Sequence, residues 1–300
     1  MLFSGDGGKD SLKAKVSSGL FTFPTRYTIG ERVIPTVESN TYNIELNGEL
    51  YKVGEFGRID SYNASKNEKI HRLALFVAMA KAIPVNEPIR LVTGTPVNLF
   101  FTDERERIKD SLMGEHLIGF GEDLDTRILN IERVLVVPES MGCIYNNYGE
   151  YGKGLIKVID LGGLNINGCI YEDGKPVRSS VFTVNDGIKI LMNSIRNTLN
   201  SGGHDYQPYE VRHLVMNGKG TAIEEAVISN TIRAYLQELR RLVGANNWNI
   251  DSGIVVFTGG GSKLLSRFIT EEFRNARISK DGVYDNVKGF YTIGEALLCQ

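Results

Sequence analysis

The feature that most constrains the fold of this chain is a pattern that occurs twice. An apolar strand ends in an aspartate, and two glycines follow within three residues. One copy is "LFSGDGGK" at residues 2–9, and the other is "VIDLGGLNIN" at residues 158–167. A single strand-end aspartate is most often only the start of a turn, but two copies in one chain favour a paired site.

A third glycine-rich turn follows an apolar strand in "GIVVFTGGGSKLL" at residues 253–265, this time without an acid. Glycines after a strand allow backbone N–H groups to approach phosphate oxygens, and a nearby lysine supplies the countercharge. Gly7, Gly8 and Lys13 fit this role, although ordinary turn glycines and a solvated lysine are the alternatives. The chain lacks the G-x-x-x-x-G-K-[ST] pattern of the phosphate-binding loop.

The segments between these turns alternate between strands and helices, which indicates an α/β fold. "NIELNGELYKVGE" at residues 43–55 predicts a β-hairpin that turns at Asn47-Gly48. Helices are predicted at 66–83, 102–112, 187–200 and 220–244, with a short helix at 287–300. Strands are predicted at 89–96 and 133–140, as a strand-turn-strand pattern within 154–184, and from residue 253.

Composition limits the class of protein. The 300 residues are 42% hydrophobic and 23% charged, which predicts a soluble globular protein with two packed domains. A formal net charge of −2 gives no reason to expect direct contact with nucleic acid. The longest apolar runs, such as "LALFVAMA" at 73–80, are too short to span a bilayer, and a cytoplasmic location without membrane contact is expected.

Cysteine and histidine are too scattered to indicate a metal or redox motif. The three cysteines are odd in number and far apart, so we expect reduced packing residues: Cys143, Cys169 and Cys299. The four histidines are equally dispersed, which argues against a histidine-rich metal site.

The three glycine motifs, taken in order, carry a resemblance to a family. "GDGGKDSLK", "VIDLGGLNIN" and "VVFTGGGSKLL" resemble the actin-like ATPase superfamily, which includes actin, the ATPase domain of heat-shock chaperones and sugar kinases. "LVTGTP" at 91–96, "VVPESMG" at 136–142 and "VKGFYTIGEALL" at 287–298 are most similar to plasmid-segregation actins of the ParM/StbA type. The resemblance covers nearly the whole chain.

This resemblance implies an α/β, actin-like fold, which is a ribonuclease H-like duplicated fold with two lobes and a nucleotide cleft between them. The first lobe is expected at 1–153 plus 285–300, with a small subdomain at about 29–61. The second is expected at 154–284, with a small subdomain at about 187–253.

The resemblance also implies the residues of a nucleotide site. The first phosphate motif, D-x-G-x-x-x-x-K, matches Asp6, Gly8 and Lys13, and its loop also includes Gly7 and Lys9. The Lys9 ammonium group is expected either to contact phosphate or to face solvent. The second phosphate motif matches Asp160, Gly162, Gly163 and Asn165. The adenosine motif matches Gly259, Gly260, Gly261 and Ser262. Gly187 falls where the family brings a backbone turn to the phosphates. The region facing the base is expected at 214–225.

The implied chemistry is hydrolysis of ATP or GTP with Mg²⁺. Asp6 and Asp160 are expected to hold the ion through water, because Mg²⁺ bound to a triphosphate keeps part of its hydration shell. Glu139, in "PES", falls where ParM-like proteins have the residue that orients the attacking water. The alternative for Glu139 is a cap for a helix that starts near Ser140.

Three functions share such a fold. The ParM-like motifs favour a filament-forming ATPase that binds to itself and, through a DNA-binding adaptor protein, to a plasmid centromere. The alternative is a small-molecule kinase of the sugar type, which needs an acceptor pocket with its own general base. A chaperone needs a client-binding domain, for which 300 residues are expected to leave no room.

Overall fold

The computed structural model of the chain describes residues 1–32, 39–59, 63 and 65–299. This described part divides into two compact units, Met1–Asn147 with Asn286–Gln300 and Tyr148–Asp285. Each unit has its own sheet and its own apolar core. Part of the small subdomain expected at 29–61 lies outside the described residues.

The described strands of the first unit form one nine-stranded sheet in the order β3-β2-β1-β7-β9-β8-β5-β6-β4. The three neighbours β1, β7 and β9 are parallel, so their carboxyl ends lie at the same edge of the sheet. The strands are β1 Leu2–Gly7, β2 Ser11–Val16, β3 Gly19–Pro24, β4 Tyr27–Ile29, β5 Thr41–Leu46, β6 Glu49–Gly54, β7 Ile89–Thr95, β8 Gly114–Phe120 and β9 Asp125–Pro138.

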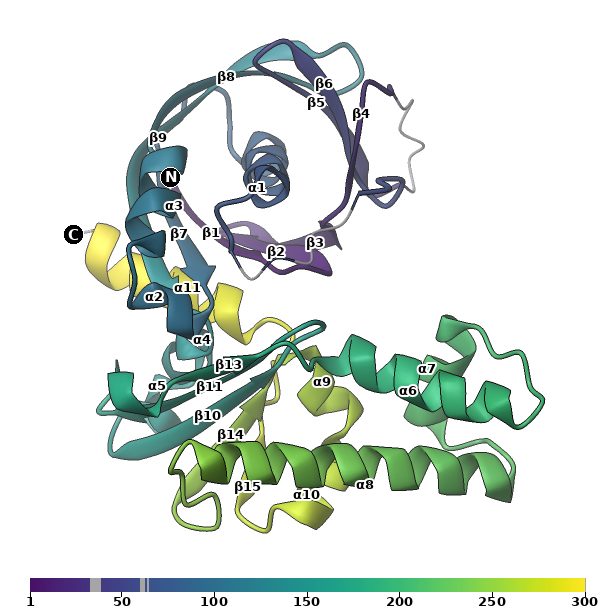
Figure 1. Cartoon of the computed structure of the whole chain (residues 1–300). Helices are drawn as coiled ribbons and strands as arrows, with labels where there is room; N and C mark the ends of the chain where they lie inside the picture. The colour runs from purple at the N-terminus through teal and green to yellow at the C-terminus, as the bar shows by residue number, and fades with distance from the viewer. Residues whose placement is uncertain (33–38, 60–62, 64, 300) are drawn as a thin grey trace. The chain divides into compact units, whose positions relative to one another are not determined.

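Helix α1, Lys69–Ala82, fills the inside of this sheet, which curves around it (Figure 1). Every residue from Leu73 to Ala80 is buried, as expected for a helix that is apolar on all sides. This confirms the helix predicted at 66–83. The other helices of the unit are α2 Val97–Phe100, α3 Glu104–Leu112, α4 Met141–Asn146 and α11 Asp285–Leu298.

The hairpin between β5 and β6 turns where the sequence predicts. Asn47 and Gly48 have φ values of 55° and 75°, and Leu46 pairs directly with Glu49. Positive φ at both central residues is the geometry of the two-residue turns that match strand twist.

The second unit has a smaller sheet in which the described strands follow the order β12-β11-β10-β14-β15, with β13 paired to β11. Strands β10, β14 and β15 are parallel, and β11 is antiparallel to β10. The strands are β10 Leu155–Leu161, β11 Ile166–Glu172, β12 Lys175–Pro176, β13 Phe182–Val184, β14 Ile254–Thr258 and β15 Ala276–Ile278.

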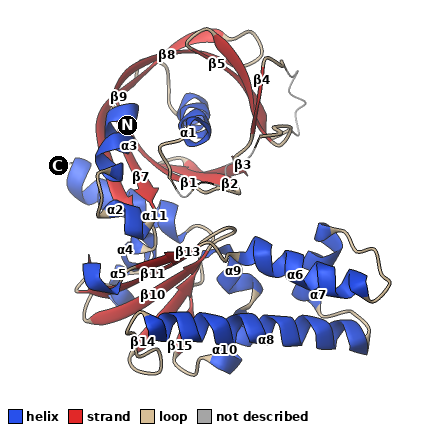
Figure 2. Ribbon diagram, in the orientation of Figure 1, coloured by secondary structure: helices blue, strands red, loops and turns tan. Residues whose placement is uncertain are grey.

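The long helix α8, Ala222–Ala245, runs alongside α6, Ile188–Ser201 (Figure 2). Buried residues of α8 recur every three or four positions, for example Ile228, Ile232 and Leu236, which gives the apolar face of an amphipathic helix. Both helices confirm sequence predictions. The remaining helices are α5 Tyr148–Tyr151, the 3₁₀ turn η1 Arg178–Ser180, α7 Pro208–Asn217, α9 Gly259–Leu264 and α10 Ser266–Glu272.

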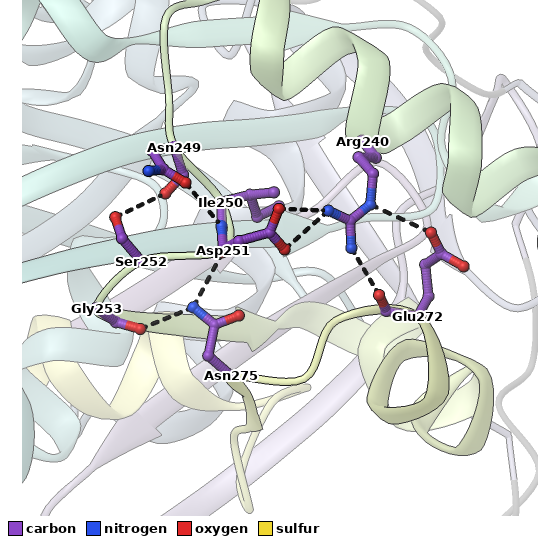
Figure 3. Close-up of polar contacts among 8 residues, drawn as sticks. All are labelled: Arg240, Asn249, Ile250, Asp251, Ser252, Gly253, Glu272 and Asn275. Carbon is purple, nitrogen blue, oxygen red and sulfur yellow. Dashed lines mark hydrogen bonds and ion pairs between the residues drawn. The ribbon is translucent and has the colours of Figure 1, made fainter.

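Arg240 connects the last turns of α8 to the segment before β14 and to the end of α10 (Figure 3). Its Nη1 donates to both carboxylate oxygens of Asp251 at 2.8 and 2.9 Å, and its Nη2 donates to the Glu272 carbonyl at 2.6 Å. Asn275 Nδ2 donates to the carbonyls of Ile250 and Gly253 at 2.9 and 2.8 Å. These bonds hold the segment before β14 against the ends of α8 and α10.

Three expectations from the sequence are wrong in detail. The turn expected at 259–261 is the start of helix α9. Helix α7 occupies much of a stretch for which no helix was predicted. Cys299 is exposed, whereas Cys143 and Cys169 are buried as expected of packing residues. Within the described ranges, no helix is long and apolar enough to cross a membrane.

Candidate functional site: two half-sites

The first half-site is the hairpin between β1 and β2. Asp6, 7% exposed, pairs across the ladder with Lys13. Gly7 still belongs to the strand, so the turn is narrower than expected and starts at Gly8, whose N–H donates to the Asp6 carbonyl at 2.8 Å. A Cβ at Gly8 would lie 2.6 Å from the Ser11 carbonyl oxygen and 3.0 Å from Lys13 Nζ, so only glycine fits there.

Glu139 lies beside this hairpin because it follows β9 at the edge where β1 and β7 also end. Its N–H donates to the Thr95 carbonyl at 2.8 Å. Lys66 connects it to the hairpin: the Lys66 Nζ is 3.0 Å from Glu139 Oε1 and donates to the Gly7 carbonyl at 2.5 Å. Lys66 and Glu139 are each 8% exposed. The structure therefore brings Asp6, Gly7 and Glu139 to one place.

Two further groups of this half-site are perturbed by burial. Burial lowers the pKa of Lys9 to about 8, Lys66 adds to the effect, and Glu139 and Glu68 oppose it. Burial, together with the charges of Lys66 and Lys9, holds the pKa of His71 well below its usual range.

The backbone directly after Glu139 is strained. Ser140 has a φ of 76°, which is unusual for a residue with a side chain. Its N–H donates to Asn286 Oδ1 at 3.0 Å. Ser140 is also the N-cap residue of α4, so the residue in the capping position of this helix is not Glu139.

The second half-site is built on β10. Asp160, 7% exposed, lies between Asn167 on β11 and Thr258 on β14. Gly259 has a φ of 83°, and a Cβ there would lie 2.3 Å from Asp160 Oδ1. The first glycine of the expected adenosine motif thus packs directly against the Asp160 carboxylate.

The loop after Asp160 is held by the start of helix α6. Gly162 donates its N–H to the Asn165 carbonyl at 2.9 Å, which closes the loop. The N–H groups of Gly187 and Ile188 donate to the carbonyls of Leu164 and Gly162 at 2.9 and 3.0 Å. Gly187 therefore lies beside the loop of Gly162 and Gly163, but its N–H is already bonded to that loop. In this structure Gly187 supports the loop.

The rest of the third glycine motif forms the first turn of α9. Gly260 is exposed, whereas Gly261 and Ser262 are buried. A Cβ at Gly261 would lie 2.3 Å from Ile188 Cγ1, so this glycine allows α9 to pack against α6. The Ser262 hydroxyl donates to the Gly259 carbonyl at 2.8 Å. Of the four motif residues, Gly260 is the one exposed to solvent.

The donor set suits a hydrated Mg²⁺ better than a fully coordinated metal. Among the residues that the structure describes, no group of three His, Cys, Asp or Glu side chains could hold a metal ion. Each half-site instead offers one buried strand-end carboxylate, Asp6 or Asp160. Mg²⁺ prefers oxygen ligands and retains waters when it is bound to phosphates, so single carboxylates fit it.

Comparisons with known proteins identify the fold. Residues 5–142 match the family model described as the N-terminal domain of actin like proteins. The Alp12 filament structure is 22% identical with a TM-score of 0.77, and the alignment covers 99% of each chain. The ADP complex of Ta0583, an archaeal actin homolog, is 16% identical with a TM-score of 0.79 and covers 99% of each chain.

A 15-stranded ParM filament from Clostridium botulinum is similar over 99% of each chain, with 18% identity and a TM-score of 0.75. The chain has the actin-like fold. No curated protein sequence matches it. The resemblance to actin-like proteins is thereby confirmed, and at these identities the likeness to the solved structures is one of fold.

The actin-like chain contains two polar contacts that the motifs do not mark. One is the bridge that Lys66 makes from Glu139 to Gly7. The other is a buried bond from the Thr258 hydroxyl to Asp285 Oδ2 at 2.5 Å, directly before the glycines of α9. No motif surrounds Lys66 in the sequence, so only the fold could reveal it.

Proposed function

We propose that the protein is a Mg²⁺-dependent nucleoside triphosphatase that assembles into filaments when nucleotide is bound. The observation that carries this proposal is the repetition, once in each unit, of a buried strand-end aspartate beside a glycine loop. The proposal is supported by a fold that matches filament structures over 99% of the chain. ATP is the proposed nucleotide, with GTP as an alternative; the solved complex of Ta0583 with ADP supports an adenine nucleotide.

The proposed mechanism needs no covalent intermediate. The loop of Gly7 and Gly8 and the ammonium groups of Lys9 and Lys13 bind the phosphates, and Glu139 orients a water for in-line attack. Asp6 and Asp160 would hold a hydrated Mg²⁺, which would supply positive charge that offsets the charge of the phosphates. Phosphoryl transfer depends mainly on such positioning and electrostatics.

We further propose that the filament moves plasmid DNA through a DNA-binding adaptor protein. The support is the ParM-like motifs together with the fold match to ParM structures. Contact with DNA is assigned to the adaptor because the chain has a net charge of −2.

The test of hydrolysis is phosphate release by purified protein with Mg²⁺ and ATP or GTP. Glu139→Gln keeps the shape of the side chain and removes the carboxylate. We expect it to lower the rate on the order of 100-fold while leaving nucleotide binding intact, because the water is no longer oriented. Filaments of this variant should therefore persist longer than those of the unsubstituted protein.

Two outcomes would contradict the proposal. A Glu139→Gln variant that hydrolyses nucleotide at the normal rate would contradict the catalytic role of Glu139. A protein that transfers phosphate to a sugar, and to water only slowly, would be a kinase.

A further inference from the structure

Lys66 is a buried cation that the proposed mechanism does not yet use. It lies in the segment before α1 and is only 8% exposed, whereas lysine is rarely fully buried unless it is paired. Because α1 starts at Lys69 and is packed in the core of the first unit, the backbone at Lys66 is held close to a fixed element. Its side chain is therefore placed by the fold.

The ammonium group of Lys66 has two partners in the half-site. Its Nζ is 3.0 Å from Glu139 Oε1, and the side chains are 6% and 10% exposed. It also donates to the carbonyl of Gly7 at 2.5 Å. That carbonyl belongs to the peptide between Gly7 and Gly8, so one cation fixes both the phosphate loop and the carboxylate.

A purely stabilising role explains this arrangement poorly. Burying two charges costs several kcal/mol of desolvation per ion, and apolar residues of similar volume often stabilise a protein as well as a buried ion pair does. A positioned carboxylate, in contrast, needs a partner that fixes its orientation, as the bases of catalytic sites commonly have. Lys66 supplies such a partner at an oxygen of Glu139.

We propose that Lys66 is a positioning residue for hydrolysis. It orients the Glu139 carboxylate toward the attacking water and fixes the position of that carboxylate relative to the Gly7-Gly8 peptide. This inference rests on the proposed function. We expect Lys66 to change the rate of hydrolysis through Glu139 and to have little effect on nucleotide affinity.

The test is a double-mutant cycle on phosphate release under single-turnover conditions. Lys66→Met retains an unbranched side chain and removes the charge. We expect it to lower the rate on the order of 100-fold, while the dissociation constant for nucleotide changes less than about threefold. Lys66→Arg, which keeps a cation, should recover part of the rate.

The cycle is completed in the Glu139→Gln background. If Lys66 acts through Glu139, adding Lys66→Met there should lower the rate little further, because coupled residues are not additive. Lys69→Met is the matched control, since Lys69 lies three residues after Lys66 and forms an exposed ion pair with Glu49 at 3.4 Å. It should leave the rate unchanged.

A urea titration tests the pair without using activity. Lys66→Met alone leaves a buried carboxylate uncompensated, so its unfolding midpoint should fall. Adding Glu139→Gln removes that carboxylate and should raise the midpoint again.

The outcomes separate the two proposals. A protein that releases no phosphate from ATP or GTP contradicts the proposed function and, with it, the role of Lys66. If the unsubstituted protein hydrolyses nucleotide but Lys66→Met keeps the normal rate, only the role of Lys66 is contradicted. Equal, additive losses in the two backgrounds would contradict a role of Lys66 through Glu139. A tenfold loss of nucleotide affinity would show that Lys66 contacts the nucleotide instead.

Discussion

Asp160 is the residue with the most direct test in the second half-site. Asp160→Asn keeps the volume that packs against Gly259 and removes the charge. We expect the fold to persist, because the carboxamide fits the same space, and hydrolysis to fall on the order of 100-fold through loss of one carboxylate beside the hydrated Mg²⁺. Circular dichroism and phosphate release measure the two effects. Normal turnover in a folded variant would remove Asp160 from the site.

Lys9 should make nucleotide binding depend on pH. Burial lowers the pKa of Lys9 to about 8 in the free protein, and a bound phosphate would raise it. Binding above pH 8 therefore requires proton uptake, so affinity should fall as pH rises from 8 toward 9.5, by at most about tenfold per pH unit for one proton. Titrations with a fluorescent nucleotide between pH 7.5 and 9.5 measure this slope.

Lys9→Arg is the control for this prediction. Arginine stays protonated over the whole range, so the variant should bind with a smaller slope. If Lys9 instead faces solvent and does not contact phosphate, the variant and the unsubstituted protein will show the same slope.

At the scale of elements, Arg240 should contribute to the stability of the segment around β14. Arg240→Gln removes two bonds to Asp251 and weakens the hold on the carbonyl of Glu272. We expect a local loss of about 1–2 kcal/mol, because the hydrogen bonds are charged but the site is partly exposed. Hydrogen exchange of amides in β14 and the last turns of α8 measures the loss.

Arg241 is the matched control on the same helix. It pairs with Glu238 three residues before it, and the two side chains are 71% and 54% exposed. Arg241→Gln should therefore destabilise the same amides much less than Arg240→Gln does. Equal effects of the two substitutions would contradict the role given to the Arg240 network.

Elements with regular apolar periodicity or strong turn residues could be predicted from the sequence, and the others could not. The periodicity of α1 and α8 and the Asn47-Gly48 hairpin gave their elements directly. Helix α9 was missed because three glycines are poor helix formers; the helix forms because Gly261 packs against Ile188 and the Ser262 hydroxyl bonds to Gly259.

Helix α7 was missed for a different reason. It buries Val211, so the sequence shows only a weak apolar pattern there. The signal that could have found it is the capping box of Gln207 and Glu210 with Pro208 in the first turn. The residues of the site also divide into those that a motif marks and those that only the fold reveals. The motifs marked Asp6, Asp160 and the glycines, but Lys66 reaches Glu139 only through tertiary folding.

At the scale of the whole molecule, we propose that bound nucleotide controls assembly into filaments. A ligand shifts a conformational equilibrium only through its different contacts with the two states. The triphosphate form should therefore favour the assembling conformation, and loss of the γ-phosphate should weaken it. Filament contacts between identical chains that do not close into a ring give an open polymer.

Sedimentation tests this central claim most directly. Purified protein at micromolar concentration is centrifuged with Mg²⁺ and no nucleotide, ATP, GTP or a non-hydrolysable analogue, and the pellets are examined by electron microscopy. We expect filaments in the pellet with a triphosphate, the most lasting ones with the analogue, and soluble protein without nucleotide. Protein that stays monomeric in every nucleotide state, and phosphorylates a sugar, would contradict the account.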